Sequence, residues 1–213
     1  MSIETRRTVS VIGLCCAVAV IMLRVGATPA SAQVRIGDPA PAFTLTDSNG
    51  GAASLADFKG KTVVLEWTNH QCPYVGKHYR GNNMQALQKK WTAQGVVWLS
   101  VISSAPGEQG HVSPQQANQL TAERGAAPTA VLFDPTGKVG HAYGARATPH
   151  MYVVNSEGAL VYMGGIDDQP SARLEDLKIA RNFVDEALKE IAQGKRVSAS
   201  GSRAYGCSIK YSS

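Results

Sequence analysis

Two apolar runs and the stretch that joins them constrain the fold of this chain more than any other feature of its sequence. Residues 62–65 and 96–102 are mostly β-branched or apolar, as expected of strands that are covered on both faces of a sheet. Between Pro73 and Gly95, apolar residues recur at helical spacing. The sequence therefore predicts a βαβ unit in which one helix connects two buried strands.

Further signals extend this unit into a mixed α/β domain. Residues 42–46 alternate as a short strand, and the glycine-rich turn at residues 47–51 predicts an opening hairpin. Ser113 and Pro114 favour the start of a helix, with serine as N-cap and proline at the first helical position. The other expected elements are the end of that helix near Gly125, a strand at residues 129–133, a hairpin formed by residues 151–154 and 160–163, and a final helix with apolar positions from Leu177 to Ile191.

The first 32 residues have the layout of a cleavable export signal. Arg6 and Arg7 precede an uncharged apolar run of 15 residues, which is short for a membrane span of about 20 residues, and Ala32 ends a small-residue cleavage site. The arginine pair also fits a weak twin-arginine signal, so ordinary secretion and the twin-arginine route both stay open. We expect a periplasmic or extracellular protein with no stable membrane anchor after cleavage.

The mature chain that this cleavage would leave has 181 residues and a formal charge of +3 instead of +5. This charge is too mild to predict a nucleic-acid partner. A domain of this size does not need disulfides to fold, so its two cysteines, Cys72 and Cys207, require a chemical explanation in an oxidising compartment.

Cys72 follows a predicted buried strand, and Pro73 suits the first turn of the next helix. A sulfur at a helix N-terminus is stabilised as a thiolate by unpaired amides and the helix dipole, which lowers the cysteine pKa. Lys77 and His78, about one turn later, are expected to add positive potential. The sequence therefore predicts a nucleophilic Cys72, and the alternative is a small inert buried side chain.

The chain also resembles a known family. Residues 37–45 and 54–61 resemble the entry to the alkyl-hydroperoxide-reductase and thiol-specific-antioxidant (AhpC/TSA) group of the thioredoxin superfamily. Residues 69–75, 148–150 and 205–211 are similar to a peroxiredoxin-like (redoxin) subfamily of that group. The resemblance implies a thioredoxin-like α/β fold over residues 33–194, with a central mixed β-sheet flanked by helices and an N-terminal β-hairpin extension. Residues 195–213 then form a basic C-terminal tail that carries Cys207.

Three further site residues are implied by this resemblance. Thr148 and Pro149 would form the thioredoxin-type cis-proline, which lies beside the active sulfur and offers backbone groups to an extended thiol or peptide substrate. Glu66, six residues before Cys72, stands where thioredoxin holds a buried carboxylate that helps to move protons. A glutamate that faces solvent at a sheet edge is the alternative for Glu66.

The chain departs from the family pattern at two positions. Val75 stands where thioredoxin has its second cysteine, so the local Cys-x-x-Cys disulfide cannot form. Asn69 replaces the threonine of the peroxiredoxin Pro-x-x-x-Thr-x-x-Cys motif, which argues against efficient peroxide reduction. Arg146, near the expected cis-proline, is interpreted either as an exposed arginine or as a ligand for an anionic or peroxidic oxygen.

Cys207 has three possible roles. As a resolving cysteine it would attack oxidised Cys72, and an external thiol reductant would reopen the bridge. As a structural cysteine it would form a permanent disulfide with Cys72 that holds the tail in place. Such a disulfide stabilises the folded state by about 4 kcal/mol in the chain-entropy model. Pairing with another chain is the third role.

Two functional hypotheses follow. The first is a thiol oxidoreductase in which Cys72, Cys207, Pro149, Thr148 and Glu66 form the site, with a thiol, disulfide or peroxide as substrate. The second keeps the fold as a non-catalytic binding or chaperone-like module. No cofactor is implied, and a metal site is disfavoured because the candidate ligands lack paired spacing; these candidates are His70, Cys72, His78 and His150. His70 and His150 are instead expected to line the sulfur pocket.

Overall fold

The computed structural model describes residue 1 and residues 34–212. The expected export signal lies outside these described residues apart from Met1. Among the described residues, no helix has the length and apolar character needed to cross a membrane.

A mixed seven-stranded sheet lies at the centre of the domain, with the strand order β2-β1-β5-β4-β3-β7-β8. The central strands β3, β4 and β5 are parallel, and the outer pairs are antiparallel. The predicted βαβ unit is confirmed, because Val63 of β3 pairs with Val97 of β4 across a helical crossover. The strands are β1 (Thr44–Asp47), β2 (Ala52–Ser54), β3 (Val63–Trp67), β4 (Val97–Ile102), β5 (Ala130–Phe133), β7 (His150–Val154) and β8 (Leu160–Gly164).

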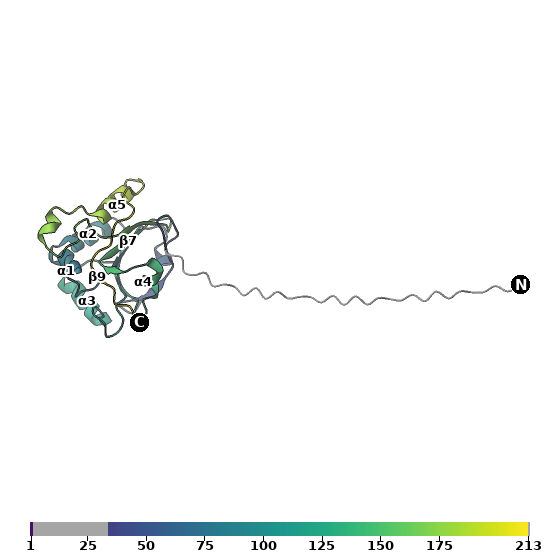
Figure 1. Cartoon of the computed structure of the whole chain (residues 1–213), viewed down its shortest axis with the longest axis horizontal. Coiled ribbons are helices and arrows are strands. Elements are labelled where there is room, and N and C mark those ends of the chain that lie inside the picture. The colour runs from purple at the N-terminus through teal and green to yellow at the C-terminus, as the bar shows by residue number, and fades with distance from the viewer. Residues whose placement is uncertain (2–33, 213) are drawn as a thin grey trace. The chain divides into compact units, whose positions relative to one another are not determined.

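Helices cover both faces of this sheet, as Figure 1 shows. The helices are α1 (Pro73–Arg80), α2 (Asn83–Thr92), α3 (Pro114–Glu123), α4 (Lys138–Tyr143) and α5 (Phe183–Ala192), with 3-10 turns at Leu55–Phe58 and Glu175–Lys178. Helices α1, α2 and α5 pack on one face, where Val64 and Trp98 belong to their buried cluster. Helix α4 packs on the other face, against Leu65 and Leu99. Alternate residues of each strand thus pack into two hydrophobic cores, one on each face of the sheet.

The helix predicted between Pro73 and Gly95 is two helices. Asn82, between α1 and α2, has a left-handed backbone with φ of 54°. Gly81 packs closely against Leu177, because a Cβ there would lie 2.1 Å from a methyl carbon of that side chain. Because both helices bury residues on the same face, the apolar spacing continues across the break.

The final helix begins later than predicted. It starts at Phe183, because the side chain of Asn182 accepts a hydrogen bond from the amide of Asp185 and caps it. Leu177 lies in the preceding 3-10 turn. The short helix α4 was not predicted; the carboxylate of Asp134 binds two amides of its first turn, those of Val139 and Gly140.

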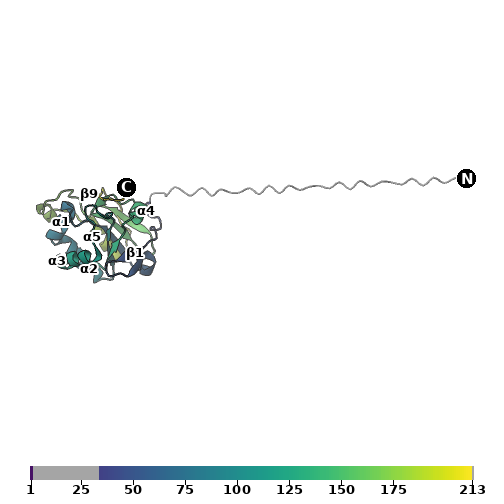
Figure 2. The same ribbon diagram turned by 90° about the horizontal axis from the view of Figure 1, so that it is seen from below.

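The C-terminal segment packs along the domain. Strand β9 (Cys207–Ser208) pairs with β6 (Ala147–Thr148) in a small antiparallel sheet, with Thr148 opposite Cys207. Further along, the Ala105 amide donates to the Lys210 carbonyl and the Tyr211 hydroxyl donates to the Ala145 carbonyl. Strand β9 and helix α1 lie side by side in both views (Figures 1 and 2).

Candidate active site

Cys72 is the N-cap residue of α1, and its side chain is 1% exposed. Pro73 occupies the first helical turn, as predicted. The loop before Cys72 is held by Asn69, whose side-chain oxygen accepts a hydrogen bond from the Gln71 amide at 2.8 Å and whose carbonyl accepts one from the Cys72 amide at 3.0 Å. Asn69, at the threonine position of the peroxiredoxin motif, therefore shapes the loop that presents the sulfur.

The structure brings Cys207 next to Cys72, although 134 residues separate them in the sequence. Burial disfavours the Cys72 thiolate, but hydrogen bonds from the Cys207 thiol, the Val75 amide and Thr148 outweigh it and lower the pKa of Cys72. The contact of 3.0 Å in which the Cys72 thiol donates to the Thr148 carbonyl favours the neutral form and opposes this shift in part. Burial and the neighbouring Cys72 raise the pKa of Cys207 to about 12. The pair therefore has one sulfur suited to attack and one that holds its proton.

The peptide bond between Thr148 and Pro149 is cis, as the resemblance implies. The backbone of β6 that leads into it is not free, because β9 of the same chain pairs with it. Gly206 makes this pairing possible, because a Cβ there would lie 2.0 Å from the Thr148 carbonyl oxygen. The position at which a thioredoxin offers backbone to a substrate is thus occupied by the tail.

Four side chains hold the tail in this position, and we call Lys77, His78, Asp167 and Tyr205 the tail clamp. The Tyr205 hydroxyl donates to Asp167 and accepts from Lys77 at 3.3 Å, and it contacts the His78 Nε2 at 3.1 Å. The ammonium of Lys77 lies 3.5 Å from the Asp167 carboxylate, and both side chains are buried.

The tail clamp corrects one expectation. Lys77 and His78 were expected to add positive potential at the sulfur. Burial and the neighbouring Lys77 instead lower the pKa of His78 to about 3, so it is neutral near pH 7. The charge of Lys77 is balanced by Asp167. These residues fix Tyr205, two positions before Cys207, rather than facing the sulfur as cations.

Glu66 is fully buried on β3, so the alternative of a solvent-facing glutamate is wrong. Its carboxylate accepts four hydrogen bonds from neutral donors. These donors are Tyr79 at 2.8 Å, Trp98 at 2.9 Å, Gln88 at 3.1 Å and Ser100 at 3.2 Å. Burial nevertheless raises its pKa, because desolvation outweighs the four bonds. The role of Glu66 in proton transfer stays a prediction.

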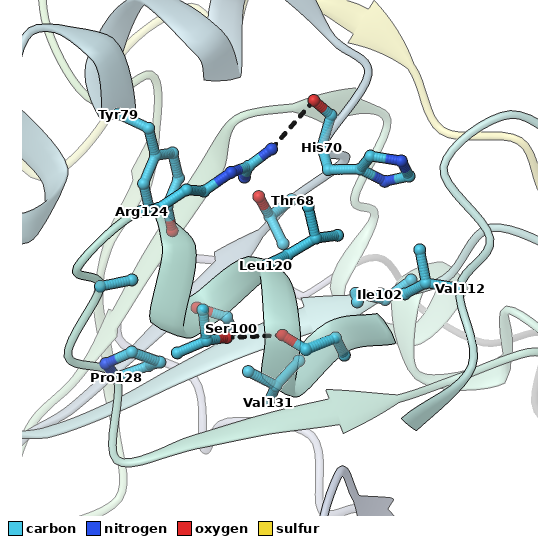
Figure 3. Close-up of a pocket in the computed structure, with 13 residues that line it drawn as sticks. Thr68, His70, Tyr79, Ser100, Ile102, Val112, Leu120, Arg124, Pro128 and Val131 are labelled. Carbon is cyan, nitrogen blue, oxygen red and sulfur yellow. Dashed lines mark hydrogen bonds between the residues drawn. The ribbon is translucent and has the colours of Figure 1, made fainter. Parts of the chain in front are cut away.

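A surface cleft borders Cys72, no tail residue is among those that line it, and the sequence did not predict one of its residues, Arg124. Cys72, Tyr79, Arg80 and Arg124 are among its lining residues. Figure 3 draws a neighbouring pocket that shares His70, Tyr79 and Arg124 with this cleft, and it shows Arg124 reaching the His70 carbonyl oxygen, at 3.1 Å, with the Tyr79 ring beside it. The guanidinium carbon lies 4.9 Å from the centre of that ring. Arg124 ends α3 in sequence, and no local motif links it to Cys72, so only the tertiary fold reveals it.

The remaining candidates, His70, His150 and Arg146, lie in different surroundings. His70 lines the cleft with Cys72, as expected. His150 does not share this cleft; its ring packs on Tyr152, with centroids 4.6 Å apart, and burial lowers its pKa to about 3. Arg146 is exposed, and its carbonyl accepts a hydrogen bond from Ile209 of the tail.

Comparisons with known proteins identify the class. A solved structure of an uncharacterised conserved protein from Geobacillus kaustophilus superposes with a TM-score of 0.72 at 26% identity, over 84% of this chain and 93% of that one. A structure from Chlorobium tepidum, provisionally titled as the thiol:disulfide interchange protein DsbE, has a TM-score of 0.50 at 24% identity over 62% and 85% of the two chains. The fold is therefore thioredoxin-like, as predicted.

Proteins that are similar in sequence include thiol oxidoreductases. The thiol-disulfide oxidoreductase ResA of Halalkalibacterium halodurans is 26% identical over 63% of this chain and 72% of its own. A Mycobacterium tuberculosis protein with the provisional name of peroxiredoxin is 30% identical over 58% and 73%. The AhpC/TSA family model matches residues 36–163. The chain belongs to the AhpC/TSA family, and its named relatives are thiol oxidoreductases of the peroxiredoxin and thiol-disulfide types.

Proposed function

We propose that this protein is an exported thiol oxidoreductase in which Cys72 is the attacking sulfur and Cys207 is the resolving sulfur. The observation that carries the proposal is the pairing of Thr148 with Cys207, which holds the second thiol beside the first. The tail thus replaces the local second cysteine, whose position Val75 occupies.

The opposite pKa shifts of the two thiols support a fixed order of steps. The lowered pKa of Cys72 favours the thiolate, which attacks a disulfide or a peroxide first. The raised pKa of Cys207 keeps this thiol protonated until Cys72 has been converted to a mixed disulfide or a sulfenic acid. Cys207 then loses its proton, attacks Cys72 and closes the bridge, and an external thiol reductant restores both thiols.

Thr148, Pro149 and Glu66 complete the proposed site. Thr148 contributes a hydrogen bond to Cys72 and the backbone that pairs with β9. Glu66 lies on the strand that leads to Cys72, and its raised pKa suits a group that accepts and returns a proton. Export to the periplasm or beyond is part of the proposal and rests on the sequence of residues 1–32.

The experiment is steady-state turnover with dithiothreitol as the reductant and glutathione disulfide or hydrogen peroxide as the oxidant. We expect turnover in the wild-type protein, none above background in Cys72→Ser, and a strongly reduced rate in Cys207→Ser. If wild type and Cys72→Ser have the same rate with both oxidants, the binding-module alternative takes the place of the catalytic one. A Cys207→Ser rate equal to wild type would remove Cys207 from the cycle.

A further inference from the structure

A substrate can approach the buried Cys72 from two directions. One approach is the backbone edge of β6 beside Pro149, and the other is the cleft that is lined by Cys72 and the end of α3. Because Cys72 is 1% exposed, whichever approach is open decides which molecules reach it.

The approach along β6 is closed by the chain itself. Extended polypeptides bind such edges by adding a strand, and β9 already fills this position with Thr148 opposite Cys207. The tail is fixed on both sides of β9, by the tail clamp before it and by Ile209 after it, which is buried and donates to the Arg146 carbonyl. A polypeptide would have to displace all of these contacts.

The cleft is open and carries unneutralised positive charge. Its charged lining residues are Arg80, Arg124 and Glu123, so guanidinium groups outnumber carboxylates. Over the part of the chain that the structure describes, neither arginine lies within ion-pair distance of a carboxylate. The Arg80 guanidinium carbon is 3.9 Å from the position of a Cβ built on Gly76, one helical turn after Cys72.

We propose that Cys72 acts on small disulfides that carry carboxylates and reach it through this cleft, and that polypeptide disulfides are excluded because β9 covers the edge of β6. This inference rests on the proposed function and specifies its substrate class. Guanidinium groups bind carboxylates through charge-assisted hydrogen bonds, so the charge of the cleft matches that of the substrate.

The reaction balances with the two cysteines alone. The Cys72 thiolate attacks one sulfur of the small disulfide, and the other half leaves as a thiolate. Cys207 then gives its proton to solvent and attacks Cys72, and the second half leaves as a thiolate. Two protein thiols are oxidised to one disulfide, and one small disulfide is reduced to two thiols.

The first test compares alkylation of Cys72 by iodoacetate, which is anionic, and by iodoacetamide, which is neutral. We expect Arg80→Gln to lower the iodoacetate-to-iodoacetamide rate ratio by roughly twofold, as a charge removed near a solvated site would. Arg196→Gln removes an exposed arginine that does not line the cleft and serves as the control. An unchanged ratio in Arg80→Gln would overturn the charge selectivity.

The second test compares the rates at which two disulfides oxidise Cys72: glutathione disulfide and unfolded ribonuclease with exposed disulfides. Mass spectrometry of the protein at successive times measures both rates. We expect the wild-type protein to react at least about tenfold faster with glutathione disulfide. Gly206→Ala displaces β9 and should raise the rate with ribonuclease. In Gly201→Ala, another glycine of the tail, the new Cβ lies no closer than 3.6 Å to its neighbours, so the rate should not change.

Equal rates of the wild-type protein with both disulfides would contradict the exclusion of polypeptides, even if Gly206→Ala fails to fold. The outcome is separable from that of the proposed function. If glutathione stays on Cys72 and no bridge to Cys207 forms, the resolving role fails while the substrate class holds. If the bridge forms equally fast with ribonuclease, the resolving role holds and the substrate class fails.

Discussion

The two sides of Cys72 are built in different ways. On the tail side, the contacts are buried, and the tail clamp joins α1 to the segment that carries Cys207. On the cleft side, the charged residues Arg80 and Glu123 are exposed and form no ion pair among the described residues. In the proposed function, the tail side stabilises the geometry of the thiol pair, and the cleft side selects the molecules that reach it. Substitutions on the tail side should therefore cost stability.

The largest effect is expected from Asp167→Asn. This change leaves the ammonium of Lys77 buried without a counter-charge, and breaking a buried pair in this way costs about 3–5 kcal/mol of unfolding free energy. Chemical denaturation measures the loss. Asp168→Asn, at the exposed neighbouring position, should lower the free energy of unfolding by less. Equal losses in the two variants would show that the buried pair does not stabilise the tail side.

Tyr205→Phe should have the next largest effect. It removes the hydroxyl that joins Lys77 and His78 to Asp167, and leaving such groups short of a partner costs about 1–3 kcal/mol. Hydrogen exchange of the Cys207 amide should accelerate as well. Tyr74→Phe, which keeps its ring against that of Tyr205, is the matched control. Unchanged exchange in Tyr205→Phe would mean that the clamp does not hold β9.

A smaller effect is expected on the pKa of Cys72 when Cys207 is replaced. Cys207→Ala removes a hydrogen-bond donor to Cys72 and should raise the pKa of Cys72, whereas Cys207→Ser keeps a hydroxyl donor and should raise it less. The pH dependence of the rate of Cys72 alkylation measures this pKa, because the thiolate is the nucleophile. If both variants titrate like the wild-type protein, the tail does not tune the attacking sulfur.

The smallest effect concerns Glu66, which lies away from the tail. Burial raises the pKa of Glu66 in the folded state, so the folded protein favours the protonated carboxyl group. The stability that this protonated form contributes is fully present below the unfolded pKa of about 4.3. It is lost as the pH rises through the folded pKa. The wild-type protein should therefore lose stability relative to Glu66→Gln as the pH rises from about 4 to neutrality. Denaturation at several pH values gives the slope, with Glu157→Gln as the exposed control. Parallel slopes in wild type and Glu66→Gln would contradict the raised pKa.

Local signals predicted much of the fold and the place of Cys72 at the start of a helix. The runs that became β3 and β4 predicted the parallel pair, and Ser113 with Pro114 predicted the start of α3. Pro73 predicted that Cys72 begins a helix, because proline at the first helical position is a signal within a few residues. The cis peptide before Pro149 followed from the family resemblance rather than from spacing.

What the sequence did not reveal depends on residues that meet only in the folded chain. Gly81, at the break between α1 and α2, packs against the distant Leu177, and the neutral state of His78 depends on burial and on Lys77. Asp167 and Arg124 carry no local motif, and their importance appears only when the fold brings them to α1 and to the loop before Cys72. Helical periodicity cannot show such contacts, because it reports which face is buried and not against what.

The central claim is that Cys72 and Cys207 form a redox pair, and the most direct test is disulfide mapping by mass spectrometry during oxidation with one equivalent of glutathione disulfide. The account predicts a transient glutathione adduct on Cys72 that decays as a Cys72–Cys207 bridge accumulates, and an adduct that persists in Cys207→Ser. A Cys72 that stays unmodified, or a wild-type adduct that persists beside a free Cys207, would contradict it.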